Sequence, residues 1–338
     1  MKIAFLLPPG MLIIGSKYKY KAMFKQFAEV GIIRNHSPEQ VAKELTNYDP
    51  DYVAVMGDAY TEWQYAALYG YRYILLAMDI ASLRVSLNAD KLKRERNMVL
   101  LADKIICTSE DHANYLNTRY GVNPQVVHLR PLRADLGFKP LPKLPGKHLV
   151  YAGGITSWKK RTENYGYRAY HKIFLSFKKQ GWKVHVYPGY ELKSKTRKEY
   201  QKYGFIIHKR VPEGRKLYQE LSQYTAGLQS YNKWSCPVKT YKYAMACRPN
   251  KLWLYLAAGI PTISFCGGNG SPMMVNGGWG VRIGNLNNLD NVKLPVITES
   301  MRQENVIDND LKRLKEYILG HSDTDTAQCD RVQQAVGA

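Results

Sequence analysis

Short apolar runs that alternate with helical segments recur along this chain from its first residues to beyond residue 260. Strands of a parallel sheet are buried on both faces, and a crossover connection must follow each one before the next. The alternation therefore predicts an α/β fold of doubly wound parallel sheets. The expected strands are 2–7, 52–57, 73–79, 104–109, 125–129, 148–154, 183–187, 205–208, 226–228 and 262–265, and the expected helices are 18–30, 63–69, 92–102 and 252–258.

A segment rich in proline and glycine divides the chain into two similar halves. Residues 131–147 contain four prolines and two glycines, and 148–154 then repeats the strand-then-glycine pattern that opens the chain. At 338 residues, each half is long enough to bury a core of its own. We therefore expect domains at 1–135 and 148–320, a linker at 136–147 and a mobile polar tail at 321–338.

Composition limits the class of protein. The chain is 45% hydrophobic and 23% charged, as globular proteins are, and no run of 18 apolar residues predicts a membrane-spanning helix. The apolar start is short and ends at Pro8-Pro9-Gly10, which favours a buried first strand over a signal peptide. Five cysteines without paired spacing indicate reduced thiols and a cytoplasmic location.

The positive charge is concentrated in one part of the sequence. The net charge is +21, and residues 159–251 alone carry 22 Lys and Arg against five Asp and Glu. A diphosphate needs only about two cations, so the excess predicts a larger anionic partner, either nucleic acid or an anionic membrane surface. A solvated basic surface that aids solubility is the alternative.

The segment 248–263 predicts an anion-binding turn. Pro249 suits the first turn of a helix, Asn250 and Lys251 follow it, and Gly259 ends the helix before the strand at 262–265. Free N–H groups and the dipole make a helix N-terminus suitable for a diphosphate. An ordinary helix-to-strand turn would have the same pattern.

The amino-acid sequence of this segment resembles a known donor-site signature. Pro249-Asn250-Lys251-Leu252 followed by Ala257-Ala258-Gly259-Ile260-Pro261 is similar to glycosyltransferases of the two-domain GT-B fold, especially the family-four retaining enzymes. Two weaker segments, 93–109 and Gly153-Gly154 with Lys159-Lys160-Arg161, resemble the end of that family's first domain and the start of its second. Leu254 and Ala246 stand where the family carries glutamates, which leaves ribose binding and donor identity open.

The resemblance implies two Rossmann-like domains facing across a cleft, with the acceptor bound by 1–135 and a nucleotide sugar, expected to be a UDP-sugar, bound by 148–320. It implies hexosyl transfer with retention and without a metal, because fixed cations replace one. Lys251 with Arg161 or Lys160 would neutralise the departing diphosphate. Asp79 ends a predicted strand and could either orient or deprotonate the acceptor hydroxyl or cap the next helix. The expected donor-binding residues are Gly10, Gly153, Gly154, Lys159, Lys160, Arg210, Val211, Asn250 and Tyr255.

Aromatic residues alternate with lysines just before this segment. Lysines bind phosphates and aromatic rings stack on bases, so the pattern favours a nucleic-acid acceptor such as a hydroxymethylated base in DNA, as some bacteriophage sugar transferases use. A membrane-peripheral transferase acting on a lipid-linked or surface glycan is the alternative. An alternative of another class is a non-catalytic nucleic-acid-binding protein on a transferase scaffold. The absence of the family's glutamates at Leu254 and Ala246 is consistent with it. The expected acceptor contacts are Lys233, Trp234, Lys239, Tyr241 and Lys242.

Overall fold

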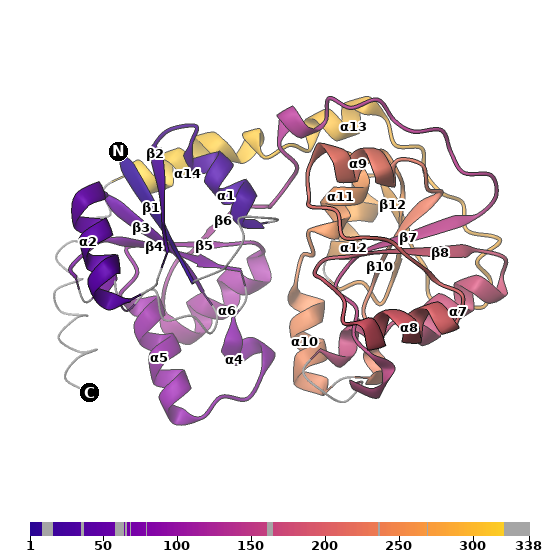
Figure 1. Cartoon of the computed structure of the whole chain (residues 1–338), viewed down its shortest axis with the longest axis horizontal. Coiled ribbons are helices and arrows are strands. Elements are labelled where there is room, and N and C mark those ends of the chain that lie inside the picture. The colour runs from indigo at the N-terminus through magenta and orange to yellow at the C-terminus, as the bar shows by residue number, and fades with distance from the viewer. Residues whose placement is uncertain are drawn as a thin grey trace. The chain divides into compact units, whose positions relative to one another are not determined.

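The computed structural model describes residues 1–8, 16–34, 37–57, 64, 66–67, 69–78, 80–160, 165–235, 237–268 and 270–320. It forms two compact units (Figure 1). Unit 1 begins with Met1–His128 and takes up the chain again from Asp308, and unit 2 is Leu129–Ile307. These limits differ from the expected domains, because the last helix belongs to unit 1 and the expected linker 136–147 belongs to unit 2.

Unit 1 is a parallel six-stranded sheet in the order β2-β1-β3-β4-β5-β6. The middle strands are wholly buried, as their apolar runs predict. Its elements are β1 Lys2–Leu7, α1 Ser16–Phe24, β2 Glu29–Arg34, α2 Pro38–Tyr48, β3 Tyr52–Met56, β4 Tyr73–Ala77, α4 Ala81–Arg84, α5 Ala89–Leu100, β5 Lys104–Cys107, α6 Glu110–Tyr120, β6 Gln125–Val126 and α14 Asp308–Leu319.

Helix α14 attaches to unit 1 through both apolar and polar contacts. Leu314 and Ile318 are buried on its inner face. The Tyr317 hydroxyl accepts a hydrogen bond from the Ile105 N–H (3.0 Å) and donates one to the Ile105 carbonyl (3.2 Å). The Lys104 ammonium lies 5.1 Å from the Tyr317 ring centroid. The helix therefore lies along strand β5 of unit 1.

Unit 2 is a second parallel six-stranded sheet, in the order β12-β11-β10-β7-β8-β9. Helices lie on both of its faces (Figure 1). Its elements are η1 Arg133–Asp135, β7 His148–Gly153, η2 Trp158–Lys160, η3 Gly166–Arg168, α7 His171–Lys179, β8 Lys183–Pro188, α8 Ser194–Lys202, β9 Ile206–Ile207, α9 Arg215–Leu221, β10 Ala226–Ser230, η4 Lys233–Ser235, α10 Val238–Ala246, α11 Lys251–Ala257, β11 Thr262–Phe265, α12 Gly270–Asn276, β12 Gly280–Arg282 and α13 Glu299–Glu304.

The predicted fold class is confirmed, and the errors fall at the sheet edges. Each expected strand is present, but β2 and β12 were not predicted. Both are edge strands with partly exposed residues, so neither has a continuous apolar run. The helix expected at 18–30 is wrong at its end, because α1 stops at Phe24 and β2 begins at Glu29. The helix expected at 63–69 lies partly outside the described residues, and the tail at 321–338 lies wholly outside them.

The expected linker packs along unit 2. The Lys143 ammonium donates to the Ser222 and Tyr224 carbonyls (2.8 and 2.9 Å), and the Leu144 N–H donates to the Gln223 carbonyl. Leu136 is buried. In the part of the chain that the structure covers, no helix combines the length and the apolar character needed to cross a bilayer.

Candidate functional site

The strand order of unit 2 changes direction between β7 and β10. From β7 the chain runs outward through β8 and β9, and it then returns to β10 on the other side. Ligands of open α/β sheets bind at the carboxyl ends of the strands at such a switch point. The two strands pair directly only at Leu149 and Val150, opposite Ala226 and Gly227. Their carboxyl ends, near Gly153 and Ser230, therefore lie beyond the hydrogen-bonded ladder.

Lys251, the first residue of α11, reaches the carboxyl end of β7. Its ammonium donates to the Tyr151 hydroxyl (3.0 Å), which donates to the Gly154 carbonyl (3.0 Å). The same ammonium lies 4.3 Å from the Tyr151 ring centroid and 5.9 and 5.8 Å from those of Tyr170 and Tyr231. Three tyrosine rings therefore surround this cation and hold it beside the loop after β7.

The surroundings of Lys251 lower the pKa of its ammonium group. Burial, and after it the positive charge of Arg168, lowers the pKa of Lys251 to about 7. Burial also raises the pKa of Tyr151 well above its usual value, so its hydroxyl remains neutral. Among the residues that the structure describes, no carboxylate forms an ion pair with Lys251. An incoming anion would therefore supply the counter-charge that this site lacks.

Arg168, at the end of η3, is the second cation of the site. Its guanidinium carbon lies 4.9 and 5.2 Å from the ring centroids of Tyr165 and Tyr167. No ion pair to Arg168 occurs within the described ranges. Sequence reasoning missed this residue, because it lies in no motif. The signal that could have found it is the run of tyrosines around it, at 165, 167 and 170. A similar alternation of aromatic and basic residues precedes the segment 248–263.

The two glycines of the loop make room for both cations. A Cβ atom at Gly154 would lie 3.1 Å from Arg168 Nη1 and 2.9 Å from the Tyr190 ring. One at Gly153 would lie 3.4 Å from Lys251 Cε, and the φ of Gly153, 152°, disfavours any side chain. The glycine loop, the lysine and the arginine thus form one compact group at the switch point.

Comparison with known proteins identifies the fold. No known family's sequence profile matches the chain, and no curated protein matches it. Among solved structures, Anabaena HepE in complex with UDP and glucose has a TM-score of 0.65 at 12% identity, covering 94% of this chain and 99% of that one. AviGT4, a glycosyltransferase involved in avilamycin A biosynthesis, has a TM-score of 0.55 at 13% identity over 100% and 98% of the two chains. The chain has the GT-B fold.

The GT-B fold by itself does not decide the reaction. UDP-GlcNAc 2-epimerase from Neisseria meningitidis, bound to UDP-GlcNAc, also has a TM-score of 0.52 at 12% identity, over 95% of this chain and 100% of that one. The expected fold is therefore confirmed, whereas membership of family four and retention stay predictions.

The structure brings three of the expected donor residues together. Lys251, Gly153 and Gly154 form the site described above. Lys159 is exposed on η2, and Asn250 caps α11 without a hydrogen bond from its side chain. Arg210 and Val211 follow β9, at the opposite edge of the sheet from β12. Gly10, Asp79, Arg161 and the side chain of Lys160 lie outside the described residues.

Tyr255 does not fit the expected contact with the donor. Its side chain is wholly buried, and its hydroxyl accepts from the Ala152 N–H (2.9 Å) and donates to the Leu228 carbonyl (3.1 Å). It therefore joins β7 to β10 where their ladder has stopped. Gly227 allows this, because a Cβ there would lie 2.3 Å from the Tyr255 ring. Leu254, at the position of a family glutamate, is likewise buried among apolar side chains.

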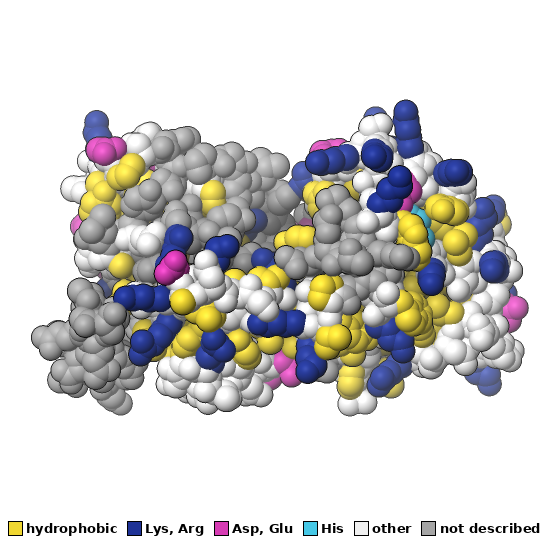
Figure 2. Space-filling model, turned by 90° about the horizontal axis from the view of Figure 1, so that it is seen from below, with side chains coloured by type: hydrophobic (Ala, Val, Ile, Leu, Met, Phe, Trp, Pro, Cys, Tyr) yellow, Lys and Arg dark blue, Asp and Glu magenta, His cyan; other side chains and the backbone are white. Residues whose placement is uncertain are grey.

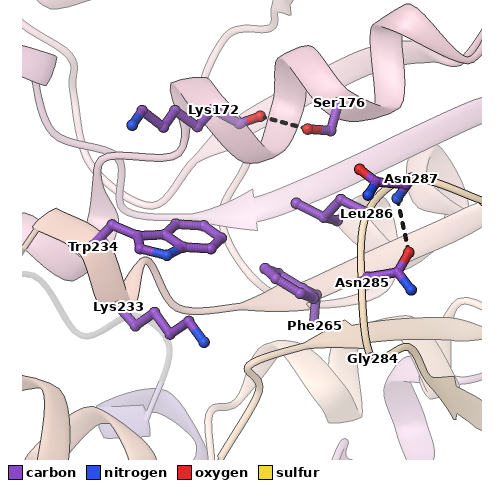
Figure 3. A pocket seen from close by; sticks show the side chains of 9 residues that line it. All are labelled: Lys172, Ser176, Lys233, Trp234, Phe265, Gly284, Asn285, Leu286 and Asn287. Carbon is purple, nitrogen blue, oxygen red and sulfur yellow. Dashed lines mark hydrogen bonds between the residues drawn. The ribbon is translucent and has the colours of Figure 1, made fainter.

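The expected acceptor residues lie at the surface of unit 2. Lys233 and Trp234, on η4, line an open pocket of about 470 Å³ (Figure 3). Lys239 and Lys242 are exposed on α10, and Tyr241 packs against a small core cluster. On the face shown in Figure 2, Lys and Arg side chains lie scattered among uncharged ones and form no continuous stripe.

Proposed function

We propose that this chain is a glycosyltransferase that takes a sugar from a nucleoside diphosphate, with a UDP-sugar as donor. The observation that carries the proposal is the pair Lys251 and Arg168 beside the glycine loop, at the switch point of a GT-B sheet. HepE binds UDP and glucose, and AviGT4 is a glycosyltransferase, which supports the same class of donor.

The two cations suit the chemistry of a leaving diphosphate. When the bond between the sugar carbon and the diphosphate oxygen breaks, its electron pair stays on that oxygen. Arg168 offers a planar fork of N–H donors and Lys251 a point charge, and both stabilise the developing negative charge. Gly153 and Gly154 let the backbone approach the phosphates. The tyrosine rings around the lysine lower the local dielectric constant, which strengthens the electrostatic interactions.

Other features of the donor site follow from the sequence resemblance. Because Leu254 is buried and apolar, the ribose hydroxyls need partners other than the family's glutamate. The loop with Arg210 and Val211 is proposed to hold the nucleobase, and the segment from Pro249 to Pro261 supports retention of configuration.

A DNA base as acceptor loses support at this stage. Duplex DNA is bound mainly through many phosphate contacts, which need a continuous basic surface. On the described part of the one face drawn in Figure 2 the basic side chains lie scattered, and the comparisons name UDP and sugars as ligands. The positive charge and the exposed Lys233, Lys239 and Lys242 still favour an anionic acceptor.

The test is turnover of a nucleotide sugar by the full chain. UDP-glucose, UDP-galactose, UDP-GlcNAc and the GDP and TDP sugars would be incubated with it, and release of the free nucleotide measured. Calorimetry would give the affinity for UDP. We expect Lys251→Met and Arg168→Gln each to weaken UDP binding by about 10- to 100-fold, since each removes a charged hydrogen bond to phosphate.

The matched control is Lys195→Met, an exposed lysine on α8, which should bind UDP as the wild type does. Equal affinities of Lys251→Met and the wild type would contradict the assignment of the site. Nucleotide binding without turnover of any of these donors would instead support the non-catalytic alternative.

A further inference from the structure

A pocket in unit 2 takes no part in the donor chemistry described above. Its volume is about 470 Å³, which is within the range of small-molecule sites (Figure 3). We call it the Trp234 pocket. Its principal lining residues are Lys172, Lys233, Trp234, Phe265, Asn285 and Asn287.

The Trp234 pocket also lies at the carboxyl edge of the sheet. Phe265 is the last residue of β11, and Asn285 follows β12 by three residues. The chain segments that build the cation site continue directly into it. Tyr231 contacts Lys251, and Trp234 lies three residues later; Tyr170 contacts Lys251, and Lys172 lies two residues later. The pocket and the cation site therefore share two chain segments at the same edge of the sheet.

Both walls of the pocket are held by side-chain amides, one of them buried. The wholly buried Asn232 accepts from the Trp234 N–H (3.1 Å) through Oδ1 and donates to the Ala169 carbonyl. Gln180 holds the opposite wall, because its amide donates to the Leu286 carbonyl (2.6 Å) and accepts from the Leu289 N–H (2.7 Å). These bonds fix the loops before any ligand binds, so the site is largely pre-formed.

An exposed aromatic face dominates the chemistry of the pocket. Trp234 is 51% exposed, although an indole ring of this size usually finds more burial. Phe265 supports the ring from one side, with centroids 5.8 Å apart and an angle of 30° between the rings. One face of the indole is thus covered and part of the side chain remains open, as a ring-shaped ligand requires.

Amides and two lysines line the pocket around this aromatic side chain (Figure 3). The Lys233 ammonium lies 5.6 Å from the Trp234 ring centroid, and the Lys172 ammonium lies 5.6 Å from the ring centroid of Trp158. Across the pocket lie Asn285, whose Oδ1 accepts from the Asn287 N–H (3.0 Å), and the Asn287 amide, so amide N–H donors remain for a ligand. The described lining residues include two lysines and no carboxylate. The pocket therefore offers an apolar platform, amide donors and positive charge.

A ligand ring cannot lie between Trp234 and Phe265, because a sandwiched ring needs the two aromatic rings about 7 Å apart, twice the stacking distance, and their centroids are 5.8 Å apart. The open part of the Trp234 side chain is therefore the only aromatic platform that the pair offers. A pyranose instead needs one open ring for its C–H face, with amides for its hydroxyls. The two lysines select a ring with a negatively charged substituent.

We propose that the Trp234 pocket binds one ring of an acidic saccharide, carrying a carboxylate or a phosphate. That this saccharide is the acceptor rests on the proposed transferase function, whereas its binding does not. The lysines would pair with the charged substituent, the asparagines with hydroxyls and Trp234 with the apolar face of the ring.

Calorimetric titrations of the full chain test the proposal. The probes are trigalacturonate, glucose 6-phosphate, neutral maltotriose and the single strand dT12. We expect an acidic saccharide to bind at least about tenfold more tightly than maltotriose, and Trp234→Ala to weaken that binding by about tenfold or more. Lys172→Gln with Lys233→Gln should abolish the preference for the acidic probe, whereas the surface control Lys195→Gln should keep it.

The remaining outcomes decide between the two proposals. Failure of both acidic probes to bind, or equal binding by wild type and Trp234→Ala, overturns the saccharide pocket. Binding of dT12 alone, lost in Trp234→Ala, would overturn it in favour of a nucleic-acid site. UDP titrated into Trp234→Ala should bind as in the wild type. Failure of the wild-type chain to bind UDP, with saccharide binding retained, would refute the donor site and leave the pocket standing.

Discussion

Lys251 shows how one residue's surroundings can set both its position and its charge. Three tyrosine rings hold its side chain beside the glycine loop, and the same burial lowers its pKa to about 7. A lysine at the surface would be charged throughout the neutral range. Here the free site is only partly protonated near pH 7, so binding of a diphosphate is linked to uptake of a proton.

The first prediction concerns this linkage. Phosphate oxygens raise the pKa of Lys251 in the complex, so above pH 7 UDP binding takes up a proton and affinity falls by up to about tenfold per pH unit. Below pH 7 the lysine is already protonated, and uptake disappears. Calorimetry at pH 8 in buffers of different ionisation enthalpy measures the proton number. Lys251→Met should show none, and equal uptake by the variant and the wild type would contradict the assignment.

A second prediction concerns Tyr255. Tyr255→Phe removes the hydroxyl that joins β7 to β10 and leaves the buried Ala152 N–H and Leu228 carbonyl unpaired. We expect a loss of about 1–3 kcal/mol in the free energy of unfolding, measured with denaturant. Tyr203→Phe is the control, because Tyr203 is 39% exposed. A loss no larger than in the control would show that the bridge does not stabilise the sheet.

At the scale of elements, three histidines connect neighbouring strands of unit 2. His148 Nδ1 and His185 Nε2 share a hydrogen bond of 2.9 Å, and His185 Nδ1 and His208 Nε2 one of 3.0 Å. These residues lie on β7, on β8 and just after β9. Burial, then the nearby His208 and His148, lowers the pKa of His185 to about 3. The His185 ring is therefore neutral in the folded protein near neutral pH.

The third prediction is acid sensitivity of this part of the sheet. Unfolded histidine titrates near pH 6.5 and folded His185 near 3, so between these values the unfolded chain binds more protons. Stability should therefore fall as the pH drops from 6.5 toward 3. Thermal unfolding of the wild type and His185→Gln at pH 7 and pH 4.5 measures the difference. The variant should lose less on acidification, and equal losses would contradict the mechanism.

At the scale of the whole molecule, the end of the described chain stabilises its beginning. Helix α14 follows unit 2 in sequence but packs on unit 1, where Tyr317 hydrogen-bonds both backbone groups of Ile105. Leu314 and Ile318 bury their side chains there. Unit 1 is therefore complete only when unit 2 has been synthesised.

A fourth prediction follows from this arrangement. A chain ending at Ile307 lacks α14 and exposes apolar surface beside β5, so unit 1 should lose amide protection in hydrogen exchange while unit 2 keeps it. A chain ending at Gly320 is the matched control, since it retains the whole helix. Unchanged protection of β4 and β5 in the shorter chain would show that α14 contributes little to unit 1.

Much of the fold was predictable because strands buried on both faces have continuous apolar sequences. The central strands β3, β4 and β5 are covered on both faces, so their apolar runs could be found without a structure. The edge strands β2 and β12 have mixed patterns, and their pairing partners, not their composition, make them strands. The place of α14 could not be predicted from the sequence either, because the periodicity of a helix does not show which unit covers its apolar face.

The sequence by itself determined the fold class, the glycine loop and Lys251, because each depends on local backbone geometry or a short motif. Only the tertiary structure decided what surrounds them. It brought Arg168 to Gly154, buried Tyr255 between two strands, and joined Trp234 to Phe265 in one pocket. These residues come from separate segments whose distances in space no local pattern encodes. A binding site depends on such distances, and therefore on the packing of the whole sheet.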